Sequence, residues 1–349
     1  LKLRGGPKTN IQEALTCYLP LIEEALREAL RTPHVALATH HGMMQYHLGW
    51  LDEGFRPRAG EGGKRLRPLL CLLACAAAGG DVRAALPAAA AIEILHNFSL
   101  VHDDIEDHSP TRRGRPTVWA LWGVPQAVNV GDALFALAHR TLGRLAEHDV
   151  PAGRVLAAMR AFDETCVALT EGQYLDMSFE ARLDVSVDEY LYMIEGKTAA
   201  LMGLSTGLGA LLAGAPAHTV ESFQRFGQRL GIAFQIEDDI LGIWGDEVLT
   251  GKPAASDILE KKKTLPVVYA LGSAVGERLR TLYRRPQLTA EDVPSVLALL
   301  EEVNAGGYAR RMAEEVHEQA LAALADTALS EEALALLREL AASLRGRQR

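Results

Sequence analysis

The chain has 349 residues, of which 48% are hydrophobic and 23% charged, so it is an ordinary globular protein rather than a disordered or fibrous one. Its formal net charge of −9 argues against nucleic-acid binding, since that binding draws most of its affinity from cationic contacts to phosphates. Four cysteines with no histidine at metal-ligand spacing exclude a disulfide framework and predict inert or buried thiols in a reducing, cytoplasmic compartment.

Helix-forming residues dominate nearly every segment, and alternating runs of β-branched residues are missing. The first ten residues lack the apolar core of a secretory signal. No break between helices is long enough to be a domain linker. We therefore expect a single all-α domain over residues 1–349, a bundle of many helices around a central apolar cavity. The predicted helices span residues 11–31, 67–78, 86–107, 152–180, 187–213, 220–244, 265–270 and onward, and 314–345.

A basic segment, Gly-Gly-Lys-Arg-Leu-Arg-Pro, begins at Gly62 and leads into the second predicted helix. Pro68 suits the first turn of that helix, and Lys64 and Arg67 are three residues apart, so both point from the helix start toward one spot. The helix dipole disfavours cations there unless an anion binds with them. The segment is therefore either an anion site or a solvated basic loop.

An acidic cluster ends the third predicted helix. Asp103 and Asp107 are four residues apart and share one face, with His96 about two turns earlier on the same side. The carboxylates oppose the helix dipole unless a cation neutralises them, and Mg²⁺ takes one or two carboxylates together with substrate phosphates. Arg112, Arg113 and Arg115 follow as cations for phosphate. The alternatives are a solvated acidic helix end and, for His96, an ordinary core histidine.

The uncharged run of residues 198–220 is long enough to cross a membrane, but its glycines and polar residues favour a buried, closely packed helix and no membrane-spanning segment. Lys197 stands at its start. A second acidic pair, Asp238 and Asp239, ends the helix that follows, and a lysine-rich segment comes after it. These lysines are either a solvated face or partners for phosphate.

Together, two acidic helix ends, three basic clusters and an apolar interior describe one chemistry. A diphosphate held by Mg²⁺, Lys and Arg becomes a good leaving group, and an apolar core protects the resulting carbocation from water. Neither a Ser-His-Asp nor a Cys-His set stands out.

With these motifs, the chain closely resembles the polyprenyl synthetase (trans-isoprenyl diphosphate synthase) family from about Gly62 to Pro266. The resemblance implies an isoprenoid-synthase type of all-α fold, usually a homodimer, that joins isopentenyl diphosphate to an allylic diphosphate with Mg²⁺. The implied reaction is ionisation of the allylic diphosphate, condensation, and elimination of a proton. The motifs that carry the resemblance are Gly-Gly-Lys-Arg-Leu-Arg-Pro, Asp-Asp-Ile-Glu-Asp from Asp103, Arg112-Arg113-Gly114, Lys197-Thr198, Phe234-Gln235 with Asp238-Asp239, and Gly251-Lys252.

The same resemblance implies roles for individual residues. The diphosphate of isopentenyl diphosphate is held by Lys64, Arg67, His96 and Arg113. The allylic diphosphate is held by Arg112, Lys197, Thr198, Gln235, Lys252 and Lys262. The metal ligands are Asp103, Asp107 and Asp238. The catalytic residues are Lys197, Thr198 and Gln235, with the oxygen dipoles of Thr198 and Gln235 turned toward the developing cation.

One position departs from the family pattern. Gly242 stands where the second acidic motif usually ends in Asp, so the resemblance implies weaker metal ligation on that side rather than lost activity. Two rival classes share parts of the pattern. A terpene cyclase would not need Lys64 and Arg67, which hold a second diphosphate. A non-catalytic partner subunit could have lost its acidic residues, whereas this chain keeps Asp103, Asp104, Asp107, Asp238 and Asp239.

Phe98 is predicted to limit the length of the product. It lies five residues before Asp103, so at about 1.5 Å per residue its ring is roughly 7.5 Å below the metal-binding carboxylates. Its neighbour Ser99 is small and leaves room. The alternative is that Phe98 is simply a core residue. An aromatic with a small neighbour resembles geranylgeranyl diphosphate synthases, which implies a C20 product, with C15 or longer products as alternatives.

Overall fold

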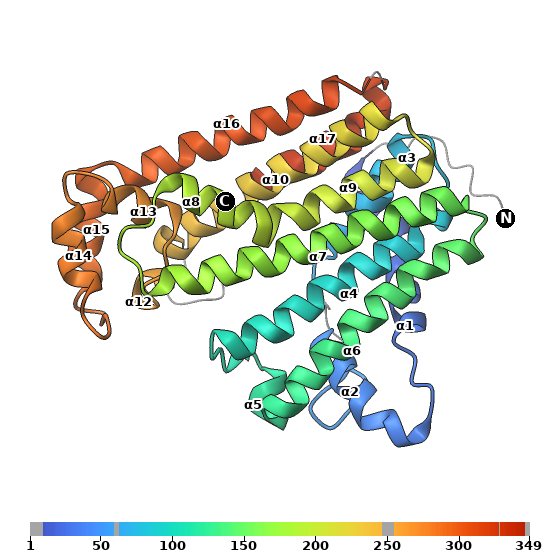
Figure 1. The fold of residues 1–349 in the computed structure, drawn as a ribbon, viewed down its shortest axis with the longest axis horizontal. Coiled ribbons are helices and arrows are strands. Elements are labelled where there is room, and N and C mark those ends of the chain that lie inside the picture. Colours follow the sequence, from blue (N-terminus) through green and yellow to red (C-terminus); the bar gives the residue numbers. More distant parts are fainter. Residues whose placement is uncertain (1–9, 59–62, 246–254, 328, 346–349) are drawn as a thin grey trace. The chain divides into compact units, whose positions relative to one another are not determined.

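A computed structural model describes residues 10–58, 63–245, 255–327 and 329–345 (Figure 1). These residues are almost entirely helical. The one pair of strands in the described ranges, β1 and β2, has two residues in each strand and forms an antiparallel hairpin. The all-α class predicted from the sequence is therefore confirmed.

The elements follow one another along the chain with short connections. The first part of the chain forms α1 (Ile11–Ala29), η1 (Val35–Leu37), α2 (Ala38–His47), α3 (Leu66–Ala77), α4 (Val82–Glu106), β1 (Thr111–Arg112), β2 (Arg115–Pro116), α5 (Val118–Trp122), α6 (Val124–Gly143) and η2 (Arg144–Glu147). The second part forms α7 (Ala152–Glu180), α8 (Val187–Ile194), η3 (Glu195–Ala199), α9 (Ala200–Ala213), α10 (Ala217–Trp244), α12 (Ser256–Leu259), α13 (Leu265–Leu271), α14 (Gly276–Tyr283), α15 (Val293–Glu302), α16 (Ala305–Ala325) and α17 (Glu331–Arg345).

The chain divides into two compact units, each assembled from three separate stretches. Unit 1 consists of residues 1–161, 205–220 and 329–337. Unit 2 consists of residues 162–204, 221–328 and 338–349. The single-domain organisation expected from the sequence stays a prediction.

Unit 1 is organised around α4, which packs along α6 and against α3 and α1 (Figure 1). The Asp81 side chain accepts a hydrogen bond from the Arg83 amide at 2.9 Å, and this cap starts the helix earlier than residue 86, where the sequence pattern placed it. Among the described helices, α4 alone is long and apolar enough to cross a membrane, with a mean hydropathy of 1.4 in its most apolar window. Two thirds of that window (67%) is buried, as in the core helix of a globular protein.

Unit 2 is organised around α13, which contacts α8, α14, α15 and α16. Ile232, Ile236 and Ile240 recur every four residues along α10, and all three are buried in one apolar cluster with Val268 of α13. Their spacing is the helical period, so the apolar stripe of α10 dictates which of its faces enters the core.

One predicted helix is divided in the structure, and another contains an irregular turn. The stretch 187–213 is helical without a break through α8, the π-helical turn η3 and α9, whereas the uncharged run 198–220 is interrupted between α9 and α10. The stretch 314–345 consists of α16 and α17, because the Ser330 hydroxyl accepts a hydrogen bond from the Ala333 amide and starts a new helix. Helices α2, α5, α6, α12, α14 and α15 were not separately predicted.

All four cysteines are free thiols. Cys71, Cys75 and Cys166 are buried, whereas Cys17 is exposed on α1. Burial raises the pKa of Cys75 to about 12, so this thiol stays protonated near neutral pH and is a poor nucleophile.

Candidate active site

The first acidic cluster sits at the C-terminal end of α4 in unit 1, and its aspartates divide between two faces. Asp104 is buried, and one of its carboxylate oxygens accepts a hydrogen bond from Arg112 Nε at 2.7 Å. Burial raises the pKa of Asp104, while the Arg112 guanidinium opposes that rise. Asp103 is half-buried, and Asp107, which caps the helix, is exposed. The two predicted metal ligands thus lie on the more open side of the helix.

These carboxylates fit a hydrated magnesium ion. In the described ranges, no three His, Cys, Asp or Glu side chains gather into a closed metal site. Mg²⁺ does not need one, since it keeps several waters and takes one or two carboxylates plus phosphate oxygens. Asp103 and Asp107, one turn apart on α4, supply such a pair.

A basic cluster in unit 1 brings together three of the four residues predicted for isopentenyl diphosphate. Arg67 Nη1 lies 3.2 Å from His96 Nε2. Burial lowers the pKa of His96 well below its ordinary value, and the positive charges of Arg67 and Arg113 lower it further, so the ring is neutral. Lys64 is exposed three residues before Arg67. A neutral imidazole among guanidinium groups can donate its ring N–H to a phosphate oxygen without adding charge.

The residue between these cations, Arg65, has a different role. It is 3% exposed and forms ion pairs with Glu23 at 2.7 Å and Glu93 at 2.8 Å. Its backbone is left-handed, with φ of 47°, directly before α3 begins. This buried anchor turns Arg65 inward and leaves Lys64 on the outside of the same short segment.

A pocket of about 130 Å³ adjoins the hairpin β1–β2 in unit 1. Arg112, Arg113 and Arg115 line it, together with His47 and Arg58, two basic residues that the sequence analysis did not single out for the site. Burial and, to a smaller extent, the positive charges of the surrounding arginines together lower the pKa of His47 to about 3. The signal that could have found these residues is the clustering of arginines on both sides of the Lys64 segment.

Phe98 projects from α4 toward α6. Its ring centroid lies 5.0 Å from that of Phe135 on α6 and 4.8 Å from that of His102, and Phe135 in turn lies 4.6 Å from His139. Phe98 is thus one member of a row of rings shared by two helices. The sequence analysis did not include Phe135, because no local pattern reveals which helix packs against α4.

In unit 2, two glycines hold the π-helical turn η3 tightly against its neighbours. A Cβ at Gly172 of α7 would lie 2.2 Å from the backbone nitrogen of Lys197, and a Cβ at Gly231 of α10 would lie 2.7 Å from Ala199 Cα. Such contacts are possible only where the side chain is absent. The backbones therefore touch, and π-helical turns of this kind are frequent at functional sites.

This packing places Thr198 beside Gln235. The Thr198 hydroxyl donates a hydrogen bond to Gln235 Oε1 at 2.9 Å, and Gln235 Nε2 donates to Asp239 Oδ1 at 3.0 Å. Lys197 forms an ion pair with Asp176 of α7. The structure thus brings together the predicted residues Thr198 of η3 and Gln235 of α10.

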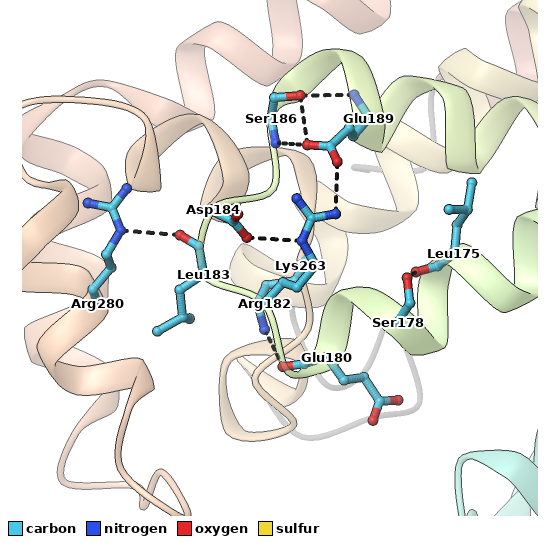
Figure 2. A network of polar contacts seen from close by, with 10 residues as sticks. All are labelled: Leu175, Ser178, Glu180, Arg182, Leu183, Asp184, Ser186, Glu189, Lys263 and Arg280. Atoms are coloured by element: carbon cyan, nitrogen blue, oxygen red, sulfur yellow. Dashed lines mark hydrogen bonds and ion pairs between the residues drawn. The ribbon is translucent and has the colours of Figure 1, made fainter.

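The connection from α7 to α8 fixes the start of α8 (Figure 2). Ser186 and Glu189 form a reciprocal capping box, and Glu189 also accepts from Arg182 Nη1 at 2.8 Å. Lys263, from the lysine-rich segment, is buried and donates to the Glu180 carbonyl at 2.9 Å. Lys262 instead pairs with Glu260 at 3.1 Å. The predicted ligand Lys252 lies outside the described residues.

The second acidic cluster repeats the division seen in the first. Asp238 is half-buried, whereas Asp239 is 6% exposed and turned inward. The pKa of Asp239 is raised to about 7, because the effect of burial exceeds that of the hydrogen bonds from Tyr190, the Leu265 amide and Gln235, which lower it. The sequence analysis assigned no role to Tyr190 or Asp239, although the spacing of Asp239 four residues after Gln235 was a usable signal.

The structure gives a physical reason for the glycine at position 242. A Cβ at Gly242 would lie 1.9 Å from Asp257 Oδ2, so the Asp257 carboxylate occupies the space of a side chain there. Position 242 lies one helical turn after Asp238. A carboxylate therefore lies beside this turn of α10, but it comes from α12.

The family model described as polyprenyl synthetase matches residues 49–300. Over 332 residues the chain is 45% identical to a geranylgeranyl diphosphate synthase of Mycobacterium tuberculosis, covering 94% of this chain and 92% of that protein. It is also 45% identical over 297 residues to a (2E,6E)-farnesyl diphosphate synthase of Mycobacterium bovis, covering 84% and 81% of the two chains.

Solved structures agree with these matches. A polyprenyl synthetase from Streptomyces coelicolor has a TM-score of 0.85 and 35% identity, covering 95% of this chain and 98% of that one. A geranylgeranyl pyrophosphate synthetase from Pyrococcus horikoshii also has a TM-score of 0.85, with 32% identity, and covers 96% and 98% of the two chains. The resemblance seen in the motifs is therefore confirmed, and the chain belongs to the polyprenyl synthetase family of prenyltransferases.

Proposed function

We propose that the chain condenses isopentenyl diphosphate with an allylic diphosphate in a magnesium-dependent reaction and makes geranylgeranyl diphosphate. One observation favours this condensing activity over the activity of a terpene cyclase. Arg67, neutral His96 and Arg113 form a cationic cluster in addition to the carboxylates Asp103 and Asp107. A cyclase binds one diphosphate and has no use for a second cationic cluster, whereas a condensing enzyme binds two.

The reaction begins with cleavage of the allylic C1–O bond, whose electron pair leaves with the diphosphate. Lys197, Arg112, Lys252 and Lys262 would hold that group. Mg²⁺ would be held by Asp103, Asp107 and Asp238 and would supply Lewis-acid stabilisation of the group's charge. Thr198 and Gln235 turn oxygen lone pairs toward the allylic cation.

In the second step, the double bond of isopentenyl diphosphate supplies the electron pair of a new carbon–carbon bond to allylic C1. A tertiary cation results, and loss of a proton from the adjacent carbon to a released diphosphate oxygen restores a double bond. Lys64, Arg67, His96 and Arg113 hold the isopentenyl diphosphate in position for this attack. Positioning two reactants in this way accounts for a large share of such a rate enhancement.

Asp257 supports the metal assignment on the side of Asp238. Its carboxylate lies against Gly242, one turn after Asp238 on α10. We expect Asp257 to compensate for the aspartate that the second motif lacks. The weaker ligation implied by the sequence alone is then less pronounced.

The row of Phe98, Phe135 and His139 supports a short product. Rings contributed by both α4 and α6 limit the length of the growing product chain more firmly than one side chain alone. We therefore favour C20, with C15 as the second candidate, since relatives named for both products are 45% identical to this chain.

The chain is further proposed to act as a cytoplasmic homodimer. Five large apolar side chains are exposed on α7, and they lie within one arc of the helix because their spacings are close to multiples of the helical period. An exposed apolar stripe of this kind marks an interaction surface. The stripe consists of Leu156, Met159, Val167, Tyr174 and Met177, which are 38–71% exposed.

Incubation of the purified chain with labelled isopentenyl diphosphate, Mg²⁺ and each allylic starter in turn tests the function. We expect product from at least one starter, no product after chelation of the metal, and a main C20 peak when the dephosphorylated products are separated by chromatography. Cyclised hydrocarbons from an allylic diphosphate alone would favour the cyclase. No product from any starter would favour a non-catalytic subunit.

A further inference from the structure

Four side chains and one amide of unit 2 form a continuous chain of hydrogen bonds. The Thr198 hydroxyl donates to Gln235 Oε1 at 2.9 Å, and Gln235 Nε2 donates to Asp239 Oδ1 at 3.0 Å. The Tyr190 hydroxyl donates to Asp239 Oδ2 at 2.5 Å, and the Leu265 amide donates to the same oxygen at 2.8 Å. Both carboxylate oxygens of Asp239 are therefore engaged.

All the hydrogen bonds in this chain run in one direction, toward Asp239. In its ionised form, which accepts from all three of these donors, Asp239 only accepts, so the amide of Gln235 must turn its NH₂ to Asp239 and its oxygen to Thr198. The Thr198 hydroxyl must then donate its hydrogen to Gln235 Oε1. Its lone pairs remain for another partner, and the string of bonds toward a carboxylate increases the electron density on the threonine oxygen.

We propose that Asp239 and Tyr190 are positioning residues that make Thr198 and Gln235 present oxygen lone pairs, rather than protons, to the allylic cation. The inference rests on the proposed function, which places these two residues beside that cation. Tyr190 is 1% exposed and Asp239 is 6% exposed, so both act through Gln235 and not by touching substrate.

The two adjacent aspartates of α10 thereby have different tasks. Asp239 is engaged by three donors inside the protein, whereas Asp238 is half-buried on the preceding position of the helix. Adjacent positions of a helix point about 100° apart, so one aspartate can orient the catalytic dipoles while the other holds the metal.

Asp239→Asn reverses the polarity of the hydrogen-bond chain. An asparagine that accepts from Tyr190 and Leu265 with its oxygen must offer its NH₂ to Gln235. The Gln235 amide then turns over and directs its own NH₂ at Thr198. We expect the single-turnover rate of condensation to fall about tenfold or more, while the dissociation constant of the allylic diphosphate changes less than about twofold.

Adding Gln235→Glu to Asp239→Asn provides the decisive rescue. The double variant exchanges the amide and the carboxylate between the two positions. The carboxylate introduced by Gln235→Glu then accepts both from the neighbouring amide and from the Thr198 hydroxyl. We expect the double variant to regain most of the rate lost by Asp239→Asn. Lost metal binding or a misfolded helix would not be repaired by this exchange.

Tyr190→Phe tests the other end of the chain without altering any carboxylate. It removes one donor to Asp239, so we expect a smaller loss of the same rate constant, again with little change in substrate affinity. Tyr283→Phe is the matched control, because Tyr283 is also buried in unit 2 and its hydroxyl has no hydrogen-bond partner among the described residues. That variant should keep the wild-type rate, and thermal melts followed by circular dichroism should show all the variants folded.

The outcomes separate this inference from the proposed function. If the wild-type chain joins the two diphosphates but Asp239→Asn and Tyr190→Phe keep its rate, the positioning role is overturned. The same holds if the exchange of amide and carboxylate recovers nothing. If the wild-type chain itself forms no product with any allylic starter, the proposed function fails first.

Discussion

Acidic side chains that are close together in the sequence of this protein differ widely in burial. At the end of α4, Asp104 is 1% exposed and bound to Arg112, while Asp107 is exposed. Removing an outer carboxylate relieves like-charge repulsion, whereas removing Asp104 leaves a guanidinium without its partner. Removing an aspartate therefore has opposite consequences for stability at neighbouring positions.

We predict that Asp103→Ala and Asp107→Ala each lower turnover by at least about 100-fold and leave the melting temperature nearly unchanged, because each removes a proposed metal ligand. Asp104→Ala serves as the contrast and should lower the melting temperature clearly. Circular dichroism and turnover measured on the same preparations provide the check. A folded Asp103→Ala variant with a normal rate would remove the metal assignment.

The neutral state of His47 predicts a dependence of stability on pH. Its pKa is lowered to about 3 in the folded protein, mainly by burial, from an ordinary value of 6.5. The unfolded chain therefore takes up this proton first as the pH falls. This group leaves stability independent of pH above about pH 6.5 and lowers it progressively as the pH falls from about 6.5 toward about 3.

We expect the free energy of unfolding of His47→Gln to fall less than that of the wild type between about pH 7 and about pH 5. Urea denaturation at the two pH values measures the difference, and the carboxylates common to both proteins cancel in the comparison. Equal pH dependence in the two proteins would show that His47 is protonated in the folded state.

At the scale of elements, the approach of two helices decides which side chain a position can hold. Gly242 of α10 faces Asp257 of α12, and a Cβ there would lie 1.9 Å from Asp257 Oδ2. Gly242→Ala should therefore destabilise the fold by about 1–3 kcal/mol, as overpacking does. Gly143→Ala at the end of α6 is the control, since a Cβ there meets nothing within 4 Å. Urea denaturation of both variants should show a loss only for the first.

The contact between α4 and α6 predicts the length of the product. Phe98→Ala and Phe135→Ala each remove one ring of the same row, so both should shift the products toward longer chains. Because the rings touch, the double variant should differ from the sum of the single effects. Chromatography of the dephosphorylated products measures the distribution. An unchanged distribution in an active, folded Phe98→Ala variant would place the floor of the cavity elsewhere.

At the scale of the whole molecule, the exposed stripe of α7 predicts self-association. Tyr174 is 71% exposed in the middle of that stripe, so Tyr174→Glu should place a charge in a dimer interface and give a monomer. Light scattering coupled to gel filtration should report the mass of two chains for the wild type. Val35→Glu, at an apolar residue 82% exposed on η1, is the control and should stay dimeric.

The sequence by itself determined the helical class and the family of prenyltransferases, and it supplied the site residues that are proposed here. Helix propensity, caps and a period of 3.6 residues are local properties, so α1, α3, α7 and α10 were expected close to where they lie. The acidic and basic motifs were visible because their residues are a few positions apart. Local spacing was enough to place Asp103 and Asp107 on one face of α4.

Only the tertiary structure decided which of these side chains turn inward. Arg65 is buried by Glu23 and Glu93, which lie 42 and 28 residues away in the chain. Asp239 is bound by Tyr190, 49 residues before it, after a π-helical turn that no periodicity revealed. A helical period ranks the faces of one helix by polarity. It cannot name the residue on another helix that will meet a given charge, because that contact exists only once both helices are packed.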